Sequence, residues 1–168
     1  MSGRSLTEAL ATLRALVGSE GAEVTGTVLR RDIERFARAS GDEAAIHFDD
    51  EAARGAGYAS APAPPLMLSS ILEWGPGPPH RELREDGTGV GRESWLPLES
   101  LRLMGGGQDL ELHAPVYDGQ QFAARPRLDG VELKEGGAGA LLLMTITTEF
   151  RAPDGTPLVT CRETLIGR

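Results

Sequence analysis

An acid and an imidazole lie five positions apart in residues 40–49, which read Ser-Gly-Asp-Glu-Ala-Ala-Ile-His-Phe-Asp. The acid is Asp42, and the imidazole is His47, one of only three histidines in the chain. An aspartate and a histidine that share one water molecule can move protons to and from a reacting group near neutral pH. We therefore take this pair as the first candidate for catalysis. The alternative is a hydrogen-bonded structural pair.

Two helical patterns flank this loop. Over 31–40 the apolar residues share one helical face, and Gly41 follows as a natural helix stop. After the loop, Asp49 or Asp50 is suited to cap a short helix that runs to Arg54. The loop is therefore expected to be held at both of its ends.

The first 20 residues and the stretch 66–74 also have helical patterns. A capping box from Ser5 to Glu8 opens the first helix. The second stretch is apolar on nearly all sides, which is typical of a buried helix. Pro65 stands directly before it, where proline is favoured.

Alternating apolar and polar residues predict strands in the rest of the chain. These strands lie at 23–29, 108–113, 121–133, 140–151 and 157–166. Residues 75–100, rich in glycine, proline and charge, predict a long connector over the surface. One strand, then helices, then four strands favour an α+β fold in which an antiparallel sheet wraps around the buried helix. We expect a single domain over residues 1–168.

Composition narrows the class of protein. The formal net charge is −8 and the basic residues are dispersed, so a nucleic-acid surface is not expected. A single cysteine excludes an intrachain disulfide framework. No apolar run approaches the length of a membrane span, and the first residues lack the apolar core of a signal peptide. A cytoplasmic protein is the expectation.

Residues 41–49 resemble the signature Gly-Asp-x-Asn-Pro-(Ile/Leu/Val)-His of the MaoC-like hydratase/dehydratase family of hot-dog folds. The connector from Asp86 to Pro97 resembles that of the branch with mesaconyl-CoA and related enoyl-CoA hydratases. The resemblance extends over about residues 20–168 and implies a hot-dog fold. Other stretches that resemble the N-terminal, dehydratase-type branch are 36–42, 49–53, 57–58, 63–67, 105–115 and 154–166.

The resemblance implies reversible hydration of a 2-enoyl thioester carried on coenzyme A or acyl carrier protein, usually to an (R)-3-hydroxyacyl product. Asp42 would orient and activate the water, and His47 would act as acid and base. The amide of Leu66 or Met67 would hold the thioester oxygen, because the two preceding prolines lack an N–H. The reaction needs no metal and no redox cofactor. The pantetheine arm would lie at a dimer interface, in a homodimer or a heterodimer.

The chain departs from the family pattern at two places. Ala44-Ala45 replaces Asn-Pro, and Gly119-Gln120 replaces Gly-Asp. Loss of the proline from the loop keeps a second interpretation open, namely a catalytically weak or silent subunit of a heterodimeric dehydratase. A hot-dog thioesterase is the third interpretation. Its carboxylate usually lies on the central helix, where Glu73 comes late and fits poorly.

The remaining residues of chemical interest have plainer interpretations. His113 alternates along a predicted strand as a hydrogen-bonded sheet residue, and His80 is expected to be solvated. Cys161 is interpreted as a small core residue. The glycines at 105–107 lack the Lys-Ser/Thr of a P-loop. The arginines that would either contact coenzyme A phosphates or be plain surface residues are Arg30, Arg31, Arg125 and Arg127.

Overall fold

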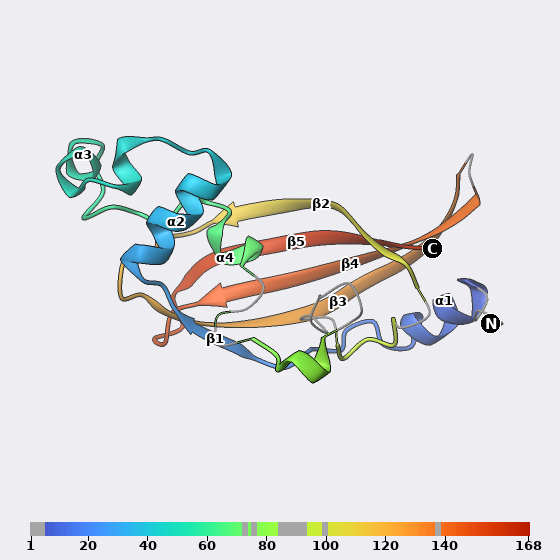
Figure 1. Cartoon of the computed structure of the whole chain (residues 1–168). Helices are drawn as coiled ribbons and strands as arrows, with labels where there is room; N and C mark the ends of the chain where they lie inside the picture. Colours follow the sequence, from blue (N-terminus) through green and yellow to red (C-terminus); the bar gives the residue numbers. More distant parts are fainter. Residues whose placement is uncertain (1–5, 72–73, 75–76, 84–93, 99–100, 137–138) are drawn as a thin grey trace.

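The computed structural model describes residues 6–71, 74, 77–83, 94–98, 101–136 and 139–168. Its main feature is one long, curved sheet of five antiparallel strands in the order β1-β3-β4-β5-β2 (Figure 1). The strands are β1 (Val24–Thr27), β2 (Leu103–Leu112), β3 (Gln121–Gly136), β4 (Gly139–Arg151) and β5 (Pro157–Gly167). The predicted α+β class is thereby confirmed.

The turn between β4 and β5 forms as its sequence predicts. Gly155 has a positive φ of 87°, a conformation that glycine adopts without a steric penalty. The side chain of Asp154 accepts the amide of Thr156 at 2.9 Å, as an aspartate in a turn commonly does. This tight turn fixes the register in which β4 pairs with β5.

A bulge in β3 keeps the long sheet apolar on one face. The pairing of β3 with β4 shifts between Leu128 and Gly130. Up to Leu128 the even-numbered positions face the core, and after the shift Val131 is buried instead. Without the extra residue, every side chain beyond it would turn to the opposite face of the sheet. The predicted irregularity at Gly130 is therefore present, whereas Pro126 stays in register.

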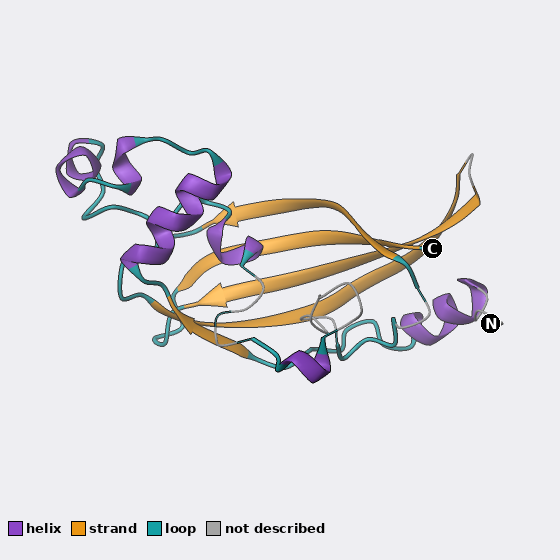
Figure 2. Ribbon diagram, in the orientation of Figure 1, coloured by secondary structure: helices purple, strands orange, loops and turns teal. Residues whose placement is uncertain are grey.

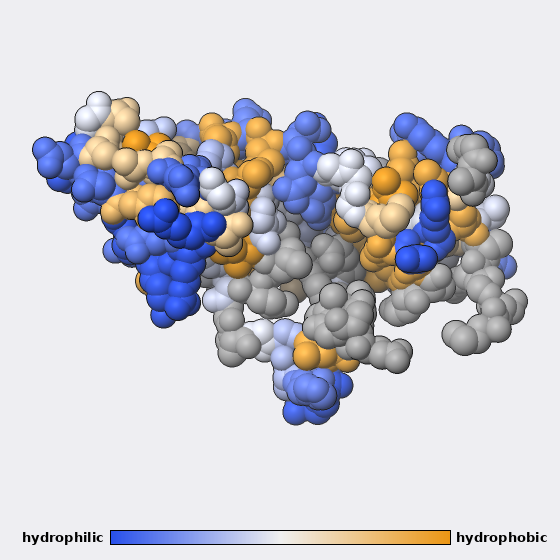
Figure 3. Space-filling view, turned by 45° about the horizontal axis from the view of Figure 1, so that its top comes forward, coloured by the Kyte–Doolittle hydropathy of each residue, from blue (hydrophilic) through white to orange (hydrophobic). Residues whose placement is uncertain are grey.

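Apart from one short turn at His80–Glu82, the helices lie toward opposite ends of the sheet (Figure 2). At one end lie α2 (Arg30–Ser40), the single 3-10 turn η1 (Ala45–His47), α3 (Asp50–Gly55) and α4 (Met67–Ser70). At the other end lies α1 (Leu6–Arg14). At the end that carries α2 and α3, strongly hydrophilic side chains are interspersed with apolar ones on the face that Figure 3 shows. The chain between 5 and 71 thus forms the helices in the predicted order.

The sheet carries two apolar clusters along its length. Near α4, Met67 and Leu68 pack with Phe122, Phe150 and other residues of the sheet. Near α1, Leu13 packs with residues of β3 and β4. The two clusters share no residue. The end of the sheet near α4 therefore has its own apolar cluster, against which a site can be built.

The buried central helix is shorter than predicted. The sequence predicts a helix over 66–74, but α4 ends at Ser70, and Ile71 is extended with ψ of 110°. Ile71 and Trp74 instead pack against the cluster near α4, and the ring of Trp74 lies edge-on to Phe122 at 4.9 Å between centroids. Tertiary packing of these two side chains therefore overrides the helical pattern.

The connector at 75–100 is also more embedded than predicted. Leu96 and Leu98 are buried in the cluster near α1, so this part does not run over the surface. A 3-10 turn, η2 (His80–Glu82), lies earlier in it, with His80 exposed as predicted. Much of the rest, including Asp86, lies outside the described residues.

Candidate active site

The loop that carries Asp42 and His47 begins at a well-formed helix end. Gly41 closes α2 in the left-handed conformation, with φ of 74°. The amide of Asp42 then donates to the carbonyl of Ala37 at 2.9 Å, and the Asp42 carboxylate accepts the amide of Ala44 at 3.0 Å. The local hydrogen bonds of α2 therefore set where the Asp42 carboxylate lies.

The 3-10 turn η1 places His47 opposite this carboxylate. Residues Ala44 and Ala45 stand where the family has Asn-Pro, yet the turn is regular. The amide of His47 donates to Ala44 at 3.1 Å, and that of Phe48 donates to Ala45 at 3.0 Å. The guanidinium of Arg38 lies over the Phe48 ring at 4.2 Å from its centroid. Backbone hydrogen bonds and this contact thus hold the turn that presents His47.

The two side chains are in direct contact. The Nε2 atom of His47 lies 3.2 Å from Oδ2 of Asp42. The His47 side chain is 5 % exposed, whereas the Asp42 side chain is 37 % exposed. A nearly buried imidazole beside a half-buried carboxylate leaves the carboxylate open to solvent and to a ligand.

The other nitrogen of His47 fixes the tautomer of the ring. Nδ1 lies 2.8 Å from the carbonyl oxygen of Pro62. A carbonyl oxygen only accepts hydrogen bonds, so Nδ1 must carry the hydrogen. Nε2, the atom that faces Asp42, is therefore the nitrogen that can take up and release a proton.

A pocket of about 480 Å³ opens on this pair. Its wall is mostly apolar, with Tyr58 and His113 as further polar groups. A mostly apolar pocket with a few polar groups, here including a carboxylate and an imidazole in contact, matches the usual composition of a small-molecule site. The lining residues are Asp42, Ala44, Ile46, His47, Tyr58, Pro62, Ala63, Pro65, Leu68, Leu112, His113, Ala114, Pro115, Val116 and Val159.

Leu66 and Met67, the predicted oxyanion donors, do not line this pocket; their neighbours Pro65 and Leu68 do. Met67 is fully buried, and its amide donates to the carbonyl of Pro64 at 3.0 Å. The side chain of Leu66 is 51 % exposed. Of the predicted site residues, the structure brings Asp42 and His47 together and leaves these two at the side.

Sequence reasoning missed the contribution of Pro62 and the position of His113. Only the folded chain shows that the Pro62 carbonyl meets His47, fifteen residues away. His113 does bond its cross-strand neighbour Thr160, at 2.9 Å, as predicted for a sheet residue. It also lines the pocket, because it lies just beyond the end of β2. Its adjacency to Ala114 and Pro115, where the strand stops, was the available signal.

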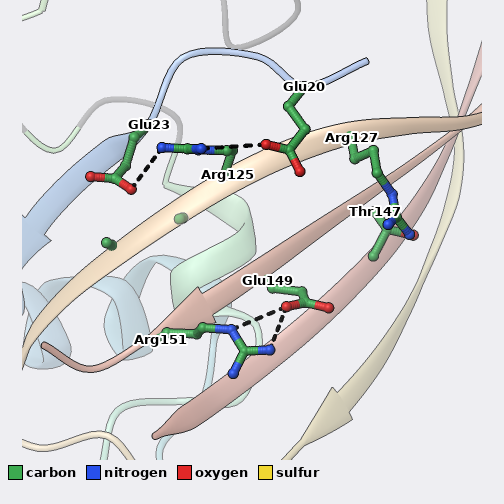
Figure 4. A pocket seen from close by; sticks show the side chains of 9 residues that line it. Glu20, Glu23, Arg125, Arg127, Thr147, Glu149 and Arg151 are labelled. Atoms are coloured by element: carbon green, nitrogen blue, oxygen red, sulfur yellow. Dashed lines mark hydrogen bonds and ion pairs between the residues drawn. The ribbon is translucent and has the colours of Figure 1, made fainter. Parts of the chain in front are cut away.

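A second hollow, of about 190 Å³, lies on the outer face of β3 and β4. There Arg125 contacts both Glu20 and Glu23, and Arg151 contacts Glu149 (Figure 4). These charged groups are about half exposed and are neutralised by one another. Charged side chains predominate in the lining of this ion-paired groove, and Ala123 and Ala124 are its apolar residues, so it suits an acyl chain poorly and is not our candidate site.

The part of the chain that the structure describes holds no cluster of three or more histidine, cysteine, aspartate and glutamate side chains suited to a metal ion. Within the same residues, no helix has the length and apolar character needed to cross a membrane. Cys161 is buried, as expected of a core residue.

Comparison with known proteins assigns the sequence to a family. Residues 15–161 match the family described as FAS1-like, dehydratase domain region. A UPF0336 protein of Saccharopolyspora erythraea is 28 % identical over 141 residues, which cover 83 % of this chain and 80 % of that protein.

Solved structures share the fold at lower identity. The ChsH1-ChsH2 complex of Mycobacterium tuberculosis matches with a TM-score of 0.72 and 19 % identity, over 96 % of this chain and 89 % of that one. The HadBC complex, a 3R-hydroxyacyl-ACP dehydratase of the same organism, matches with a TM-score of 0.66 and 19 % identity, over 90 % and 97 %. A MaoC-like dehydratase matches with a TM-score of 0.69 and 22 % identity, over 92 % of this chain and 43 % of that one.

The expected hot-dog fold is thereby confirmed. The family match covers most of the chain, and it includes the loop with Asp42 and His47 and all of the sheet up to β5. The chain belongs to the family described as FAS1-like, dehydratase domain region, and it shares its fold with a MaoC-like dehydratase.

Proposed function

We propose that this protein catalyses the reversible hydration of a 2-enoyl thioester to a 3-hydroxyacyl thioester, at the pocket of Asp42 and His47. The proposal rests on the 3.2 Å contact between Asp42 Oδ2 and His47 Nε2, two side chains that line a mostly apolar pocket. Membership of a hydratase/dehydratase family supports the reaction class.

The donors and acceptors of Asp42 and His47 explain why a water molecule suits this pair. With Nδ1 donating to Pro62, the neutral imidazole presents a lone pair at Nε2, and the Asp42 carboxylate also only accepts. Two acceptors side by side are satisfied by a donor with two hydrogens. A water molecule that donates one hydrogen to each would be held with its oxygen lone pairs directed into the pocket.

The same two acceptors can take and return the protons that the reaction moves. As the water oxygen bonds to Cβ of the enoyl group, one of its protons passes to His47 Nε2 or to Asp42. The Cα–Cβ double bond opens, and Cα takes a proton from the same pair. No proton is gained or lost overall, so the reverse sequence dehydrates the 3-hydroxyacyl thioester.

Negative charge that builds on the thioester oxygen needs a hydrogen-bond donor. We propose the amide of Leu66 for this role, because Leu66 directly follows the pocket-lining Pro65 and Met67 already donates to Pro64. The acyl group would arrive on coenzyme A or on acyl carrier protein. We propose a dimer as the working assembly, as a homodimer or with a second hot-dog subunit.

The direct test is the loss of enoyl absorbance when the purified chain is mixed with crotonyl-CoA. Turnover that disappears in both Asp42→Asn and His47→Asn supports the proposal. Turnover that survives in either variant at the wild-type rate contradicts it. Release of free thiol from a saturated acyl-CoA would point to the thioesterase alternative, whose candidate Glu73 lies outside the described residues.

A second candidate function is that of a weak or silent subunit in a heterodimeric dehydratase. It is favoured by the likeness to the ChsH1-ChsH2 and HadBC complexes, and by Ala44-Ala45 in place of Asn-Pro. Co-expression with a neighbouring hot-dog subunit separates the two candidates. Activity that needs the partner, and that persists in the His47→Asn variant of this chain, would assign the chemistry to the partner.

A further inference from the structure

Arg30, the first residue of α2, makes an unusual number of directed contacts for a residue away from the pocket. Its side chain is 29 % exposed, and its donors reach Glu34 within α2, the neighbouring residues Phe48 and Asp50, and the distant Asp118. The backbone amide of Arg30 donates to Asp118 at 2.8 Å. In the guanidinium, Nε donates to Glu34 at 2.8 Å, Nη1 donates to Asp50 at 2.7 Å, and Nη2 donates to the carbonyl of Phe48 at 2.5 Å. One planar guanidinium thus ties α2 to the segment that directly follows His47.

The first segment that this network holds is the chain directly after His47. Phe48 follows the imidazole, and its carbonyl accepts from Nη2 of Arg30. Since η1 ends at His47, this contact holds the end of the turn that presents the ring. A shift of the Phe48 carbonyl would turn the Cα–Cβ bond of His47 with it.

The second segment contains Pro62, whose carbonyl accepts the hydrogen bond from Nδ1 of His47. The Asp50 carboxylate oxygen that binds Arg30 also accepts the amide of Ala61, at 2.9 Å. Two residues on, the amide of Ala63 donates to the carbonyl of Val116 at 2.7 Å. The carbonyl of Pro62, which binds His47, therefore lies between two anchored amides, and one of these anchors reaches back to Arg30.

The charges of this network are secure at neutral pH. The hydrogen bond to Glu34, followed by that to Asp50, raises the pKa of Arg30 above its ordinary value. The amide of Ala61, followed by the Arg30 side chain, lowers the pKa of Asp50. The guanidinium and its carboxylate partner consequently stay ionised and paired.

We propose that Arg30 and Asp50 are positioning residues that fix the imidazole of His47 from both of its sides. Arg30 holds the backbone after the ring, and Asp50 holds the segment whose carbonyl selects the Nδ1–H tautomer. The role in turnover rests on the proposed hydratase function, whereas the geometric role does not. Neither side chain is among the lining residues of the pocket, so both act through His47.

Arg30→Ala tests the proposal, with Arg125→Ala as its matched control. Both arginines have two carboxylate partners, but Arg125 lies on the outer groove, away from His47. We expect kcat of Arg30→Ala to fall about 10- to 100-fold with little change in KM, because small misplacement of a catalytic group costs about that much. Guanidinium ion added to Arg30→Ala should restore part of the loss, and Arg125→Ala should keep the wild-type kcat.

A second readout does not depend on turnover. In ¹⁵N NMR spectra of the imidazoles, wild type should show a protonated Nδ1 for His47, assigned by its loss in His47→Asn. That signal should broaden or shift in Arg30→Ala and in Asp50→Ala, and less in Asp50→Asn, whose amide oxygen can still accept from Ala61. An unchanged signal in a folded Arg30→Ala protein would overturn the proposal, as would an unchanged kcat in an active wild type.

The two readouts separate the two proposals. If wild type lacks hydratase activity but the His47 signal still depends on Arg30 and Asp50, the function fails and the positioning role stands. If Arg30→Ala is too unstable to purify, Asp50→Ala and Asp50→Asn carry the same test. Equal spectra for wild type and both Asp50 variants would then reject the role.

Discussion

The pocket of His47 and the groove of Arg125 each place a carboxylate beside a nitrogen-bearing side chain at similar distances, yet the two sites differ in burial. Asp42 and His47 are 3.2 Å apart, and Arg125 lies 3.3 Å from Glu20 and 3.1 Å from Glu23. The His47 side chain is 5 % exposed, whereas that of Arg125 is 51 % exposed. In the groove, water screens each pair, so the contacts contribute little. In the pocket, the imidazole is removed from water on most sides.

The difference also lies in what each group can do. An arginine paired with two carboxylates has no proton to exchange near neutral pH, whereas imidazole exchanges one readily. Apolar neighbours such as Leu68 and Val159 surround the pocket pair, but charged side chains surround Arg125. A dense set of charges is therefore a weaker indication of a reaction site than one titratable pair in an apolar wall.

His47→Asn should produce the largest loss of activity. The amide nitrogen of asparagine can still donate to Pro62, so the loop is retained, but the new side chain cannot take up and release a proton as the imidazole does. We expect kcat to fall about 10²- to 10⁴-fold, the usual contribution of a general acid or base. Steady-state hydration of crotonyl-CoA measures the effect. Retained activity in a correctly folded variant would remove His47 from the mechanism.

Asp42→Asn should be the next largest. Asparagine keeps the oxygen that accepts the amide of Ala44, so the turn persists while the negative charge is lost. We expect kcat to fall by about 10²-fold, and the free energy of unfolding to change by no more than about 0.5 kcal/mol, since the side chain is half-exposed. Urea titration beside the kinetic assay checks both. A stability loss without a kinetic one would mark Asp42 as purely structural.

The order of the elements could be predicted because their signals are local. Gly41 ends α2, Asp49 caps α3, and alternation marks the four long strands. The length of the central helix could not be predicted in this way. Its apolar pattern suits a helix over 66–74, but the contact of Trp74 with Phe122 is long-range and draws the chain out of the helix after Ser70.

The residues of the candidate site also differ in whether the sequence could predict them. Asp42 and His47 belong to one loop, so their spacing in the sequence already brings them together. Pro62, His113 and the Arg30–Asp50 contact join segments that are distant in sequence. Nothing in the residue types at those positions indicates which pairs will meet, because the meeting depends on how α2, α3 and the end of β2 are packed.

The network that supports His47 has a pH dependence that arises from Asp50. Hydrogen bonds from Ala61 and Arg30 lower the pKa of Asp50 in the folded protein. Stability from such a carboxyl is fully present above the pKa of the unfolded chain and is lost as pH falls through the folded pKa. The difference in unfolding free energy between wild type and Asp50→Asn should hold constant from neutral pH to about pH 4 and shrink below it. Urea titrations across this range measure the difference, and a value that does not vary with pH would contradict the assignment.

Arg125→Ala should give the smallest effect and is the sharpest check on the comparison. It removes two exposed ion pairs, so we expect a stability loss of at most about 1 kcal/mol and no change in kcat. Because salt screens exposed charges, the loss should diminish in about 1 M NaCl, where the screening length is about 3 Å. Urea titrations in low and high salt provide the measurement. A loss of several kcal/mol that persists in high salt would mean that water does not screen the groove, and burial would then no longer distinguish it from the pocket.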